Sequence, residues 1–153
     1  MTIFLDIDGV LIPAKSWETP VLLRDGFPDF TASSVSVLRK IISHSTKVVL
    51  TSSHRSRFSL EEWRQIFKIR GIQLSYIERL DDNQEGVSRR EEMLNWFNRN
   101  HSINDFIIID DDSSLNDLPS DFKNRLISTS SFIGLTENHL NLITDLINDA
   151  VLP

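Results

Sequence analysis

The amino-acid sequence predicts an α/β protein with three layers, in which helices cover both faces of a central, mainly parallel sheet of five strands. Two observations support this prediction. Short runs of Ile, Leu, Val and Phe alternate along the 153 residues with longer segments of helical periodicity. In addition, the apolar runs Ile3–Leu5 and Phe106–Ile109 are each followed by carboxylates, and open α/β sheets bind ligands at the carboxyl ends of their strands.

The first third of the chain is expected to contain two strands, a flap and a helix. Ile3–Asp6 is predicted as the first strand, and residues 9–28 hold Gly, Pro and Asp and are predicted to form the short flap. Thr31 is a good N-cap for the helix that follows, and Lys47–Leu50 has the composition of a buried strand. The apolar stripe of this helix consists of Val35, Leu38, Ile41 and Ile42.

The rest of the chain repeats the alternation of helix and strand. A capping box predicts that the second helix begins after Ser59, and Gly71 is expected to end it. Residues 72–77 are predicted as a third strand and residues 88–99 as a third helix. The remaining expected elements are strands 106–109 and 126–128 and a last helix, capped by Thr136, with Leu140, Ile143 and Ile147 on one face.

The composition is that of a single globular domain, residues 1–153, and it excludes several classes of function. A chain of this length buries about 70% of its unfolded surface. The absence of cysteine excludes disulfides, thiolate zinc sites and cysteine nucleophiles. A net charge of −6 argues against a broad nucleic-acid-binding surface but permits a local basic rim. No apolar run is long enough to cross a membrane and no signal peptide is evident, so we expect a cytoplasmic protein.

Two clusters of acidic residues are the main functional signal in the sequence. Asp6 and Asp8 lie at the end of the first strand, and Asp110 and Asp111 follow the strand at residues 106–109. Carboxylates at the ends of buried strands need a compensating cation or proton. Two such strand ends form an oxygen-rich pocket suited to a hard cation, for which we predict Mg²⁺.

Four motifs in these strand contexts resemble the haloacid dehalogenase (HAD) superfamily of phosphohydrolases, which use an aspartate nucleophile. They are Asp6-Ile7-Asp8-Gly9, Thr51 or Ser52 after Val48-Val49-Leu50, Arg89 or Arg90 on a later helix, and Asp110-Asp111. The stretches 50–55, 89–97, 109–112 and 134–136 are similar, more narrowly, to the small capless HAD domain of bacterial RNA-repair (Swiss Army Knife) proteins. This chain has His54, interpreted as a loop residue, where that family usually has Trp.

The resemblance implies a Rossmann-like (HAD-like) fold and a Mg²⁺-dependent phosphomonoesterase. Asp6 would be the nucleophile that forms an aspartyl-phosphate, and Asp8 would be the general acid and base. Asp6, Asp110 and the main-chain carbonyl of Asp8 would hold the Mg²⁺, with Asp111 supporting the metal site. The sequence by itself does not distinguish the roles of the first two aspartates.

Residues of the second and third motifs would bind the phosphoryl group. Thr51 offers a hydroxyl and Ser52 a main-chain N–H; we favour Thr51, with a purely structural polar loop as the alternative. The helical register favours Arg89 over Arg90 for balancing the phosphoryl charge, although the superfamily usually has Lys there. Arg55 is expected to contact the substrate at the mouth of the pocket.

The spacing between the motifs leaves no room for a large cap domain. About 20 residues separate Gly9 from the first helix and about 30 separate Arg55 from Arg89, whereas independent domains rarely have fewer than about 50 residues. An open site suits a phosphorylated substrate such as an RNA or DNA end or a nucleotide. The alternatives are a small-molecule phosphatase or phosphotransferase and a non-catalytic binding module. The sequence makes no prediction of oligomeric state.

Overall fold

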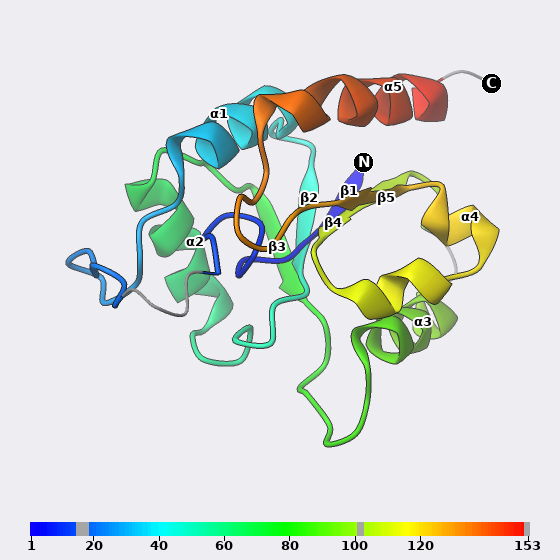
Figure 1. The fold of residues 1–153 in the computed structure, drawn as a ribbon, viewed down its shortest axis with the longest axis horizontal. Coiled ribbons are helices and arrows are strands. Elements are labelled where there is room, and N and C mark those ends of the chain that lie inside the picture. The colour runs from blue at the N-terminus through cyan, green and yellow to red at the C-terminus, as the bar shows by residue number, and fades with distance from the viewer. Residues whose placement is uncertain (15–18, 101–102, 152–153) are drawn as a thin grey trace.

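Five parallel strands form the central sheet, in the order β3-β2-β1-β4-β5 (Figure 1). The structure is a computed structural model that describes residues 1–14, 19–100 and 103–151. The strands are β1 (Thr2–Leu5), β2 (Lys47–Leu50), β3 (Tyr76–Arg79), β4 (Phe106–Asp110) and β5 (Leu126–Ser128). The predicted α/β fold is therefore confirmed, and the sheet is parallel throughout rather than mainly parallel.

The register of the three inner strands positions the functional motifs. Leu5 of β1 lies beside both Leu50 of β2 and Ile109 of β4. The residue that follows each of these partners is therefore delivered to the same edge of the sheet. These residues are Asp6, Thr51 and Asp110.

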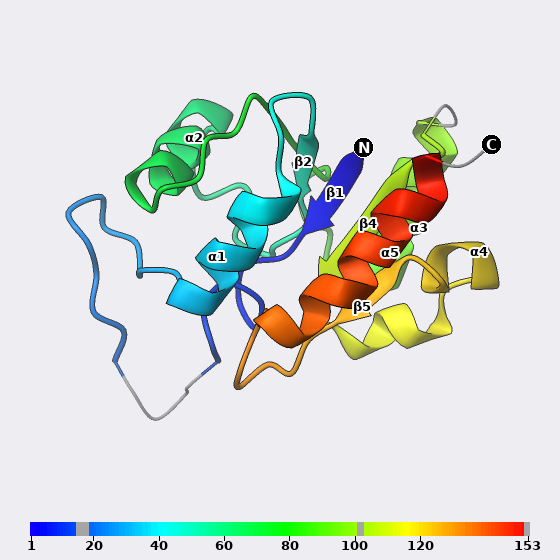
Figure 2. The ribbon, with the colours of Figure 1, turned by 90° about the horizontal axis from the view of Figure 1, so that it is seen from above.

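Alternating residues of the strands bury two separate apolar cores, one on each face of the sheet. One core contains Ile3 and Leu5 and packs against α1 (Ala32–Ile41), α2 (Leu60–Ile69) and α5 (Leu140–Val151). The other contains Phe4 and packs against α3 (Arg89–Arg99) and α4 (Ser120–Lys123). Figure 2 shows α1 and α5 side by side over one face. The remaining helical elements of the described residues are two short 3₁₀ helices, η1 (Ser113–Asp117) and η2 (Glu137–His139).

Most of the predicted helix boundaries agree with the structure because they rest on local capping. Thr31 accepts a hydrogen bond from the N–H of Ser34 and caps α1, and Ser59 and Glu62 form the predicted capping box of α2. Ser88 accepts from the N–H of Glu91 and caps α3. Three first turns are thus fixed by side chains that lie next to them in the sequence.

Three details of the secondary structure differ from the prediction. The third strand spans Tyr76–Arg79 rather than 72–77, because the chain pairs with β2 only from Tyr76 onward, although Ile72 and Leu74 are buried. Thr136 precedes η2, and the last helix begins at Leu140. The short helices η1 and α4 were not predicted.

The flap, residues 9–28, is joined to the end of α2 by a buried arginine. The Arg70 guanidinium forms an ion pair with Asp25 at 2.6 Å and donates from Nε to the carbonyl of Pro28 at 3.1 Å. Residues 15–18 of the predicted flap lie outside the described residues. Across the described ranges, neither the flap nor the segment between α2 and α3 forms a cap domain, and no helix is both long and apolar enough to cross a membrane.

Candidate active site

Three carboxylates converge at the carboxyl edge of the sheet. Asp6 follows β1, Asp110 ends β4 and Asp111 comes next, and each offers an oxygen within 4.8 Å of the others. Asp6 and Asp110 are buried, whereas Asp111 is partly exposed. Main-chain N–H groups orient the two buried side chains, because Ile7 donates to Asp6 at 2.8 Å and Asp112 donates to Asp110 at 3.0 Å.

Burial makes two negative charges at this position unfavourable. It raises the pKa of Asp6 well above the ordinary value, and the charge of Asp110 raises it further, while Arg89 opposes the shift. Burial also raises the pKa of Asp110, again against the effect of Arg89. The candidate ligand atoms are all oxygens, and Arg89 does not fully neutralise the two buried carboxylates. Such a set of ligands fits a hard divalent cation.

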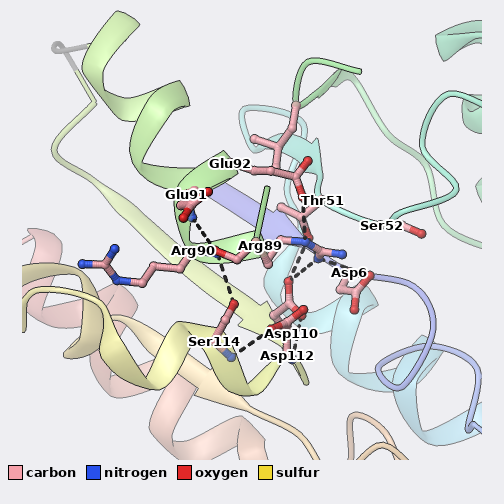
Figure 3. A network of polar contacts seen from close by, with 12 residues as sticks. Asp6, Thr51, Ser52, Arg89, Arg90, Glu91, Glu92, Asp110, Asp112 and Ser114 are labelled. Carbon is pink, nitrogen blue, oxygen red and sulfur yellow. Dashed lines mark hydrogen bonds and ion pairs between the residues drawn. The ribbon is translucent and has the colours of Figure 1, made fainter. Parts of the chain in front are cut away.

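Arg89 is the cation that the structure places against these carboxylates (Figure 3). Its Nη1 lies 2.7 Å from Asp110 Oδ2, 3.2 Å from Thr51 Oγ1 and 3.7 Å from Asp6 Oδ1. Burial lowers the pKa of Arg89, but the neighbouring carboxylates, Asp110 first, outweigh it and the net shift is upward. Within the described residues, Arg89 Nε is buried without a hydrogen-bond partner.

The choice between neighbouring candidates follows from where their side chains point. The Arg90 guanidinium turns away from the cluster and its Nε donates to the carbonyl of Asp117 at 2.9 Å (Figure 3). Thr51 Oγ1 lies 3.1 Å from Asp110 Oδ2, whereas the hydroxyl of Ser52 points away and accepts from the N–H of His54. The structure thus brings Arg89 and Thr51 to the carboxylates. Phosphate binding by the main-chain N–H of Ser52 stays a prediction.

Asp8, two residues after Asp6, is more exposed than the three clustered carboxylates. Its carboxylate is about half exposed and stands 3.3 Å from Nε2 of His54, a contact that the interpretation of His54 as a loop residue missed. The next residue must be glycine: Gly9 has φ +80°, and a Cβ atom there would lie 1.9 Å from Asp111 Oδ2. The tight turn therefore lets the loop after β1 approach the loop after β4.

The segment after β5 supports these two loops. Thr129 Oγ1 donates to the carbonyl of Gly9 at 2.7 Å, and Ser131 Oγ donates to Asp111 Oδ2 at 2.8 Å. The sequence did not predict a role for either residue. Their partners lie 120 positions away for Thr129 and 20 for Ser131, and no local sequence pattern indicates such distant hydrogen bonds. Asp112, by contrast, caps η1 through the N–H of Ser114.

The prediction that Arg55 lies at the mouth of the pocket is wrong. Its side chain is fully buried, and its guanidinium donates to main-chain carbonyls and pairs with Glu92. Nη1 bonds the carbonyls of Thr51 at 3.3 Å and Ser52 at 3.1 Å, and Nη2 bonds that of Asp81 at 2.6 Å. A turn closed by the Arg55 N–H and the Ser52 carbonyl folds the side chain inward instead of toward the pocket.

Arg55 instead joins the second motif to the third. Its partner Glu92 lies one helical turn after Arg89, and Glu92 Oε1 is 3.8 Å from Arg89 Nε. Arg89 in turn contacts Asp110 and Thr51. We therefore interpret Arg55 as a positioning residue that fixes α3, and with it the Arg89 guanidinium, relative to the loop after β2.

The sheet order, the absence of a cap in the described residues and the acidic cluster define a haloacid dehalogenase (HAD) domain of the capless kind. More particularly, the chain belongs to the family of HAD domains in Swiss Army Knife RNA repair proteins, whose family model matches residues 2–140. The resemblance noted in the sequence is thereby confirmed. Neither the curated proteins nor the solved structures gave a match.

The raised carboxyl pKa values predict an unusual pH dependence of stability. The folded state retains protons on Asp6 and Asp110 that the unfolded chain releases, so without metal the free energy of unfolding should fall as the pH rises from about 4 through the folded-state pKa values. Asp6→Asn removes one charge. At neutral pH, the free energy of unfolding of the metal-free variant should then be about 1 kcal/mol higher than that of the metal-free wild type. Urea unfolding in EDTA at a series of pH values measures both effects.

An exposed acidic residue on α4 provides the control for this experiment. Asp121→Asn should change the free energy of unfolding by less than about 0.5 kcal/mol. Added Mg²⁺ should stabilise the wild type more than Asp6→Asn, since the variant offers one charged ligand fewer. A metal-free Asp6→Asn protein that is less stable than the wild type at neutral pH would contradict the description of the site.

The buried guanidinium of Arg55 predicts a second effect on stability. Arg55→Lys keeps the charge but cannot reach the same set of carbonyls together with Glu92, so it should lower the free energy of unfolding by about 2–4 kcal/mol. Arg57→Lys, an exposed position two residues on, is the matched control and should change it by less than about 0.5 kcal/mol. Equal effects in urea unfolding would show that Arg55 has no special structural role.

Proposed function

We propose that this chain is a Mg²⁺-dependent phosphomonoesterase that uses Asp6 as its nucleophile and passes through an aspartyl-phosphate. One observation carries the proposal: the carboxylate of Asp6 stands within 4.8 Å of oxygens of Asp110 and Asp111 and 3.7 Å from the guanidinium of Arg89. A nucleophilic carboxylate is thereby combined with a cation-binding set and a fixed positive charge. These are the requirements for attack on an anionic phosphate ester.

The two half-reactions assign separate tasks to the two aspartates after β1. An oxygen of Asp6 attacks phosphorus, the ester P–O bond breaks, and the carboxyl group of Asp8 gives its proton to the departing alcohol. Asp8 then accepts a proton from the water that attacks the aspartyl-phosphate, which releases inorganic phosphate and restores the Asp6 carboxylate. The exposure of the Asp8 side chain supports its role toward both the alcohol and the water.

Three further side chains hold the phosphoryl group and the metal. Arg89 and the hydroxyl of Thr51 meet at Asp110, so a phosphoryl oxygen bound beside Asp6 would find both donors in place. Asp6, Asp110 and the main-chain carbonyl of Asp8 would hold the Mg²⁺, with Asp111 in support. Bound there, the ion neutralises phosphate charge that otherwise repels the attacking carboxylate.

The substrate that we favour is a phosphate on an RNA or DNA end or on a nucleotide. The family to which the chain belongs is found in RNA repair proteins. The described residues form no cap domain, and this supports a substrate whose phosphate is displayed on a polymer. Arg57, three residues after His54 in the sequence, is exposed, and we choose it as the candidate for a contact with a neighbouring phosphate.

Substitution of the two aspartates tests the covalent mechanism. Asp6→Asn should reduce phosphatase turnover by at least about 10³-fold, because the attacking oxygen is lost. Asp8→Asn should still form the phosphoenzyme with an aryl phosphate, whose leaving group needs no proton, but should hydrolyse it about 10²-fold more slowly. Stopped-flow kinetics measures the burst of released phenol, and equal residual turnover in both variants would rule the mechanism out.

The dependence on salt tests the preference for a polymer. Affinity for a phosphorylated oligonucleotide should fall with a log–log slope of about −0.7 for each phosphate contact, whereas kcat/KM for an aryl phosphate should depend little on salt. Arg57→Ala should make the slope for the oligonucleotide shallower by about 0.7, the contribution of one phosphate contact, and should leave kcat/KM for the aryl phosphate unchanged. Coinciding salt dependences for the two substrates would favour a small-molecule phosphatase instead.

A further inference from the structure

A cleft lies between α3 and the segment that connects β3 to it. Its volume is about 380 Å³, which is within the range of small-molecule sites. One wall comes from the connecting segment, residues 80–87, which leaves β3, turns and comes back to α3 (Figure 1). The other wall is a face of α3 that includes Glu92, Asn95 and Asn98. The residues that line the cleft are different from those of the acidic cluster.

Glu92, in the wall of the cleft, is joined to the acidic cluster by Arg89. Glu92 Oε1 lies 3.8 Å from Arg89 Nε, and Arg89 Nη1 lies 3.7 Å from Asp6 Oδ1 (Figure 3). Because the guanidinium is planar and rigid, the carboxylate oxygens of Glu92 and Asp6 are at most about 10 Å apart. A nucleoside monophosphate has a similar length from its phosphorus to the far edge of its base. A phosphate at Asp6 and a base in the cleft can therefore belong to one molecule.

The connecting segment is held in place from both sides. The guanidinium of Arg55 donates from Nη2 and Nε to the carbonyl of Asp81, at 2.6 and 3.0 Å. Ser56 Oγ donates to Asp82 Oδ1 at 2.7 Å, and Arg99 of α3 forms an ion pair with Asp81 from across the cleft. The cleft is therefore formed before a ligand enters, and binding there has a small cost in conformational entropy.

Unpaired carboxamides and apolar side chains line the cleft together. Within the part of the chain that the structure describes, no hydrogen bond involves the side-chain amides of Gln84, Asn95 and Asn98. Leu80 and Val87 add apolar surface beside them. A carboxamide donates and accepts hydrogen bonds at the same time, so it complements the adjacent donors and acceptors on the edge of a nucleobase.

The charges of the cleft favour a neutral ligand over a second phosphate. Two basic side chains lie there, but Arg55 is paired with Glu92, and Arg99 is paired with Asp81. Asp82 adds a further carboxylate to the lining. An anion would therefore meet net negative charge, whereas a neutral base would not be repelled.

We propose that this cleft binds the base of the nucleoside whose phosphate is transferred to Asp6. The proposal rests on the proposed function, because it assumes that the phosphate binds at Asp6 and Arg89. Asn95 and Asn98, one helical turn apart on α3, form hydrogen bonds with the edge of the base. The cleft thus adds a preference for a phosphate carried by a nucleoside, which the acidic cluster by itself cannot supply.

Comparison of substrates with and without a base tests this assignment. The measured quantity is the ratio of kcat/KM for adenosine monophosphate, with the phosphate on the 3′ or the 5′ oxygen, to kcat/KM for the matching ribose phosphate. The double variant Asn95→Ala/Asn98→Ala should lower this ratio about tenfold, mainly through KM for the nucleotide, because the base loses two hydrogen-bond partners. The variant should fold normally, since alanine is a better helix former than asparagine.

The matched control is the same substitution on a helix that covers the other face of the sheet. Asn148 is an exposed residue of α5, and Asn148→Ala should leave the ratio unchanged. A ratio that is the same in the wild type, the double variant and the control would overturn the proposal.

A binding measurement separates failure of this inference from failure of the proposed function. In Asp6→Asn, which cannot turn over, calorimetry with Mg²⁺ should give a Kd for adenosine monophosphate about tenfold below that for ribose phosphate. Adding Asn95→Ala/Asn98→Ala should abolish the difference, and this result supports the cleft even if the wild type hydrolyses neither substrate. If the wild type hydrolyses both, but the two Kd values are equal or their difference persists in the combined variant, the cleft does not bind the base and the phosphatase stands.

Discussion

The site depends on two carboxylates, Asp6 and Asp110, that are buried side by side at the edge of a parallel sheet. Their burial and mutual repulsion raise the pKa of Asp6, and Arg89 supplies only part of the compensating charge. A cation that binds there removes the remaining penalty. The same arrangement that weakens the metal-free fold would therefore favour the binding of a divalent ion by the folded chain.

Several features of the fold serve to hold these charges in place. The parallel register brings the ends of β1, β2 and β4 to one edge, and Gly9 permits the loop after β1 to touch Asp111. Arg55 joins the loop after β2 to α3 through Glu92 and so fixes the position of Arg89. The buried guanidinium of Arg55 therefore has a structural role, whereas Arg89, on α3, contacts the carboxylates directly.

Charged and hydrogen-bonding groups from several loops surround the site. Arg89 lies against Asp110 and Asp6, and Ser131, in the turn after β5, holds Asp111 beside them. His54 stands at the exposed side, against Asp8, where the family usually has Trp. Without a cap in the described residues, these loops would form the surroundings of a substrate bound at the proposed site.

The sequence by itself determined the layers of the fold, most of the helix caps and the acidic residues that meet at the edge of the sheet. These features depend on local patterns: apolar periodicity, Ser and Thr before helices, and carboxylates after buried strands such as Ile107–Ile109. Only the tertiary structure decided the burial of Arg55, the pairing of His54 with Asp8 and the support of Asp111 by Ser131. Each of these features depends on contacts between segments that are distant in the sequence. Such contacts are decided by the direction of the side chains and the geometry of the loops, and local sequence patterns predict neither.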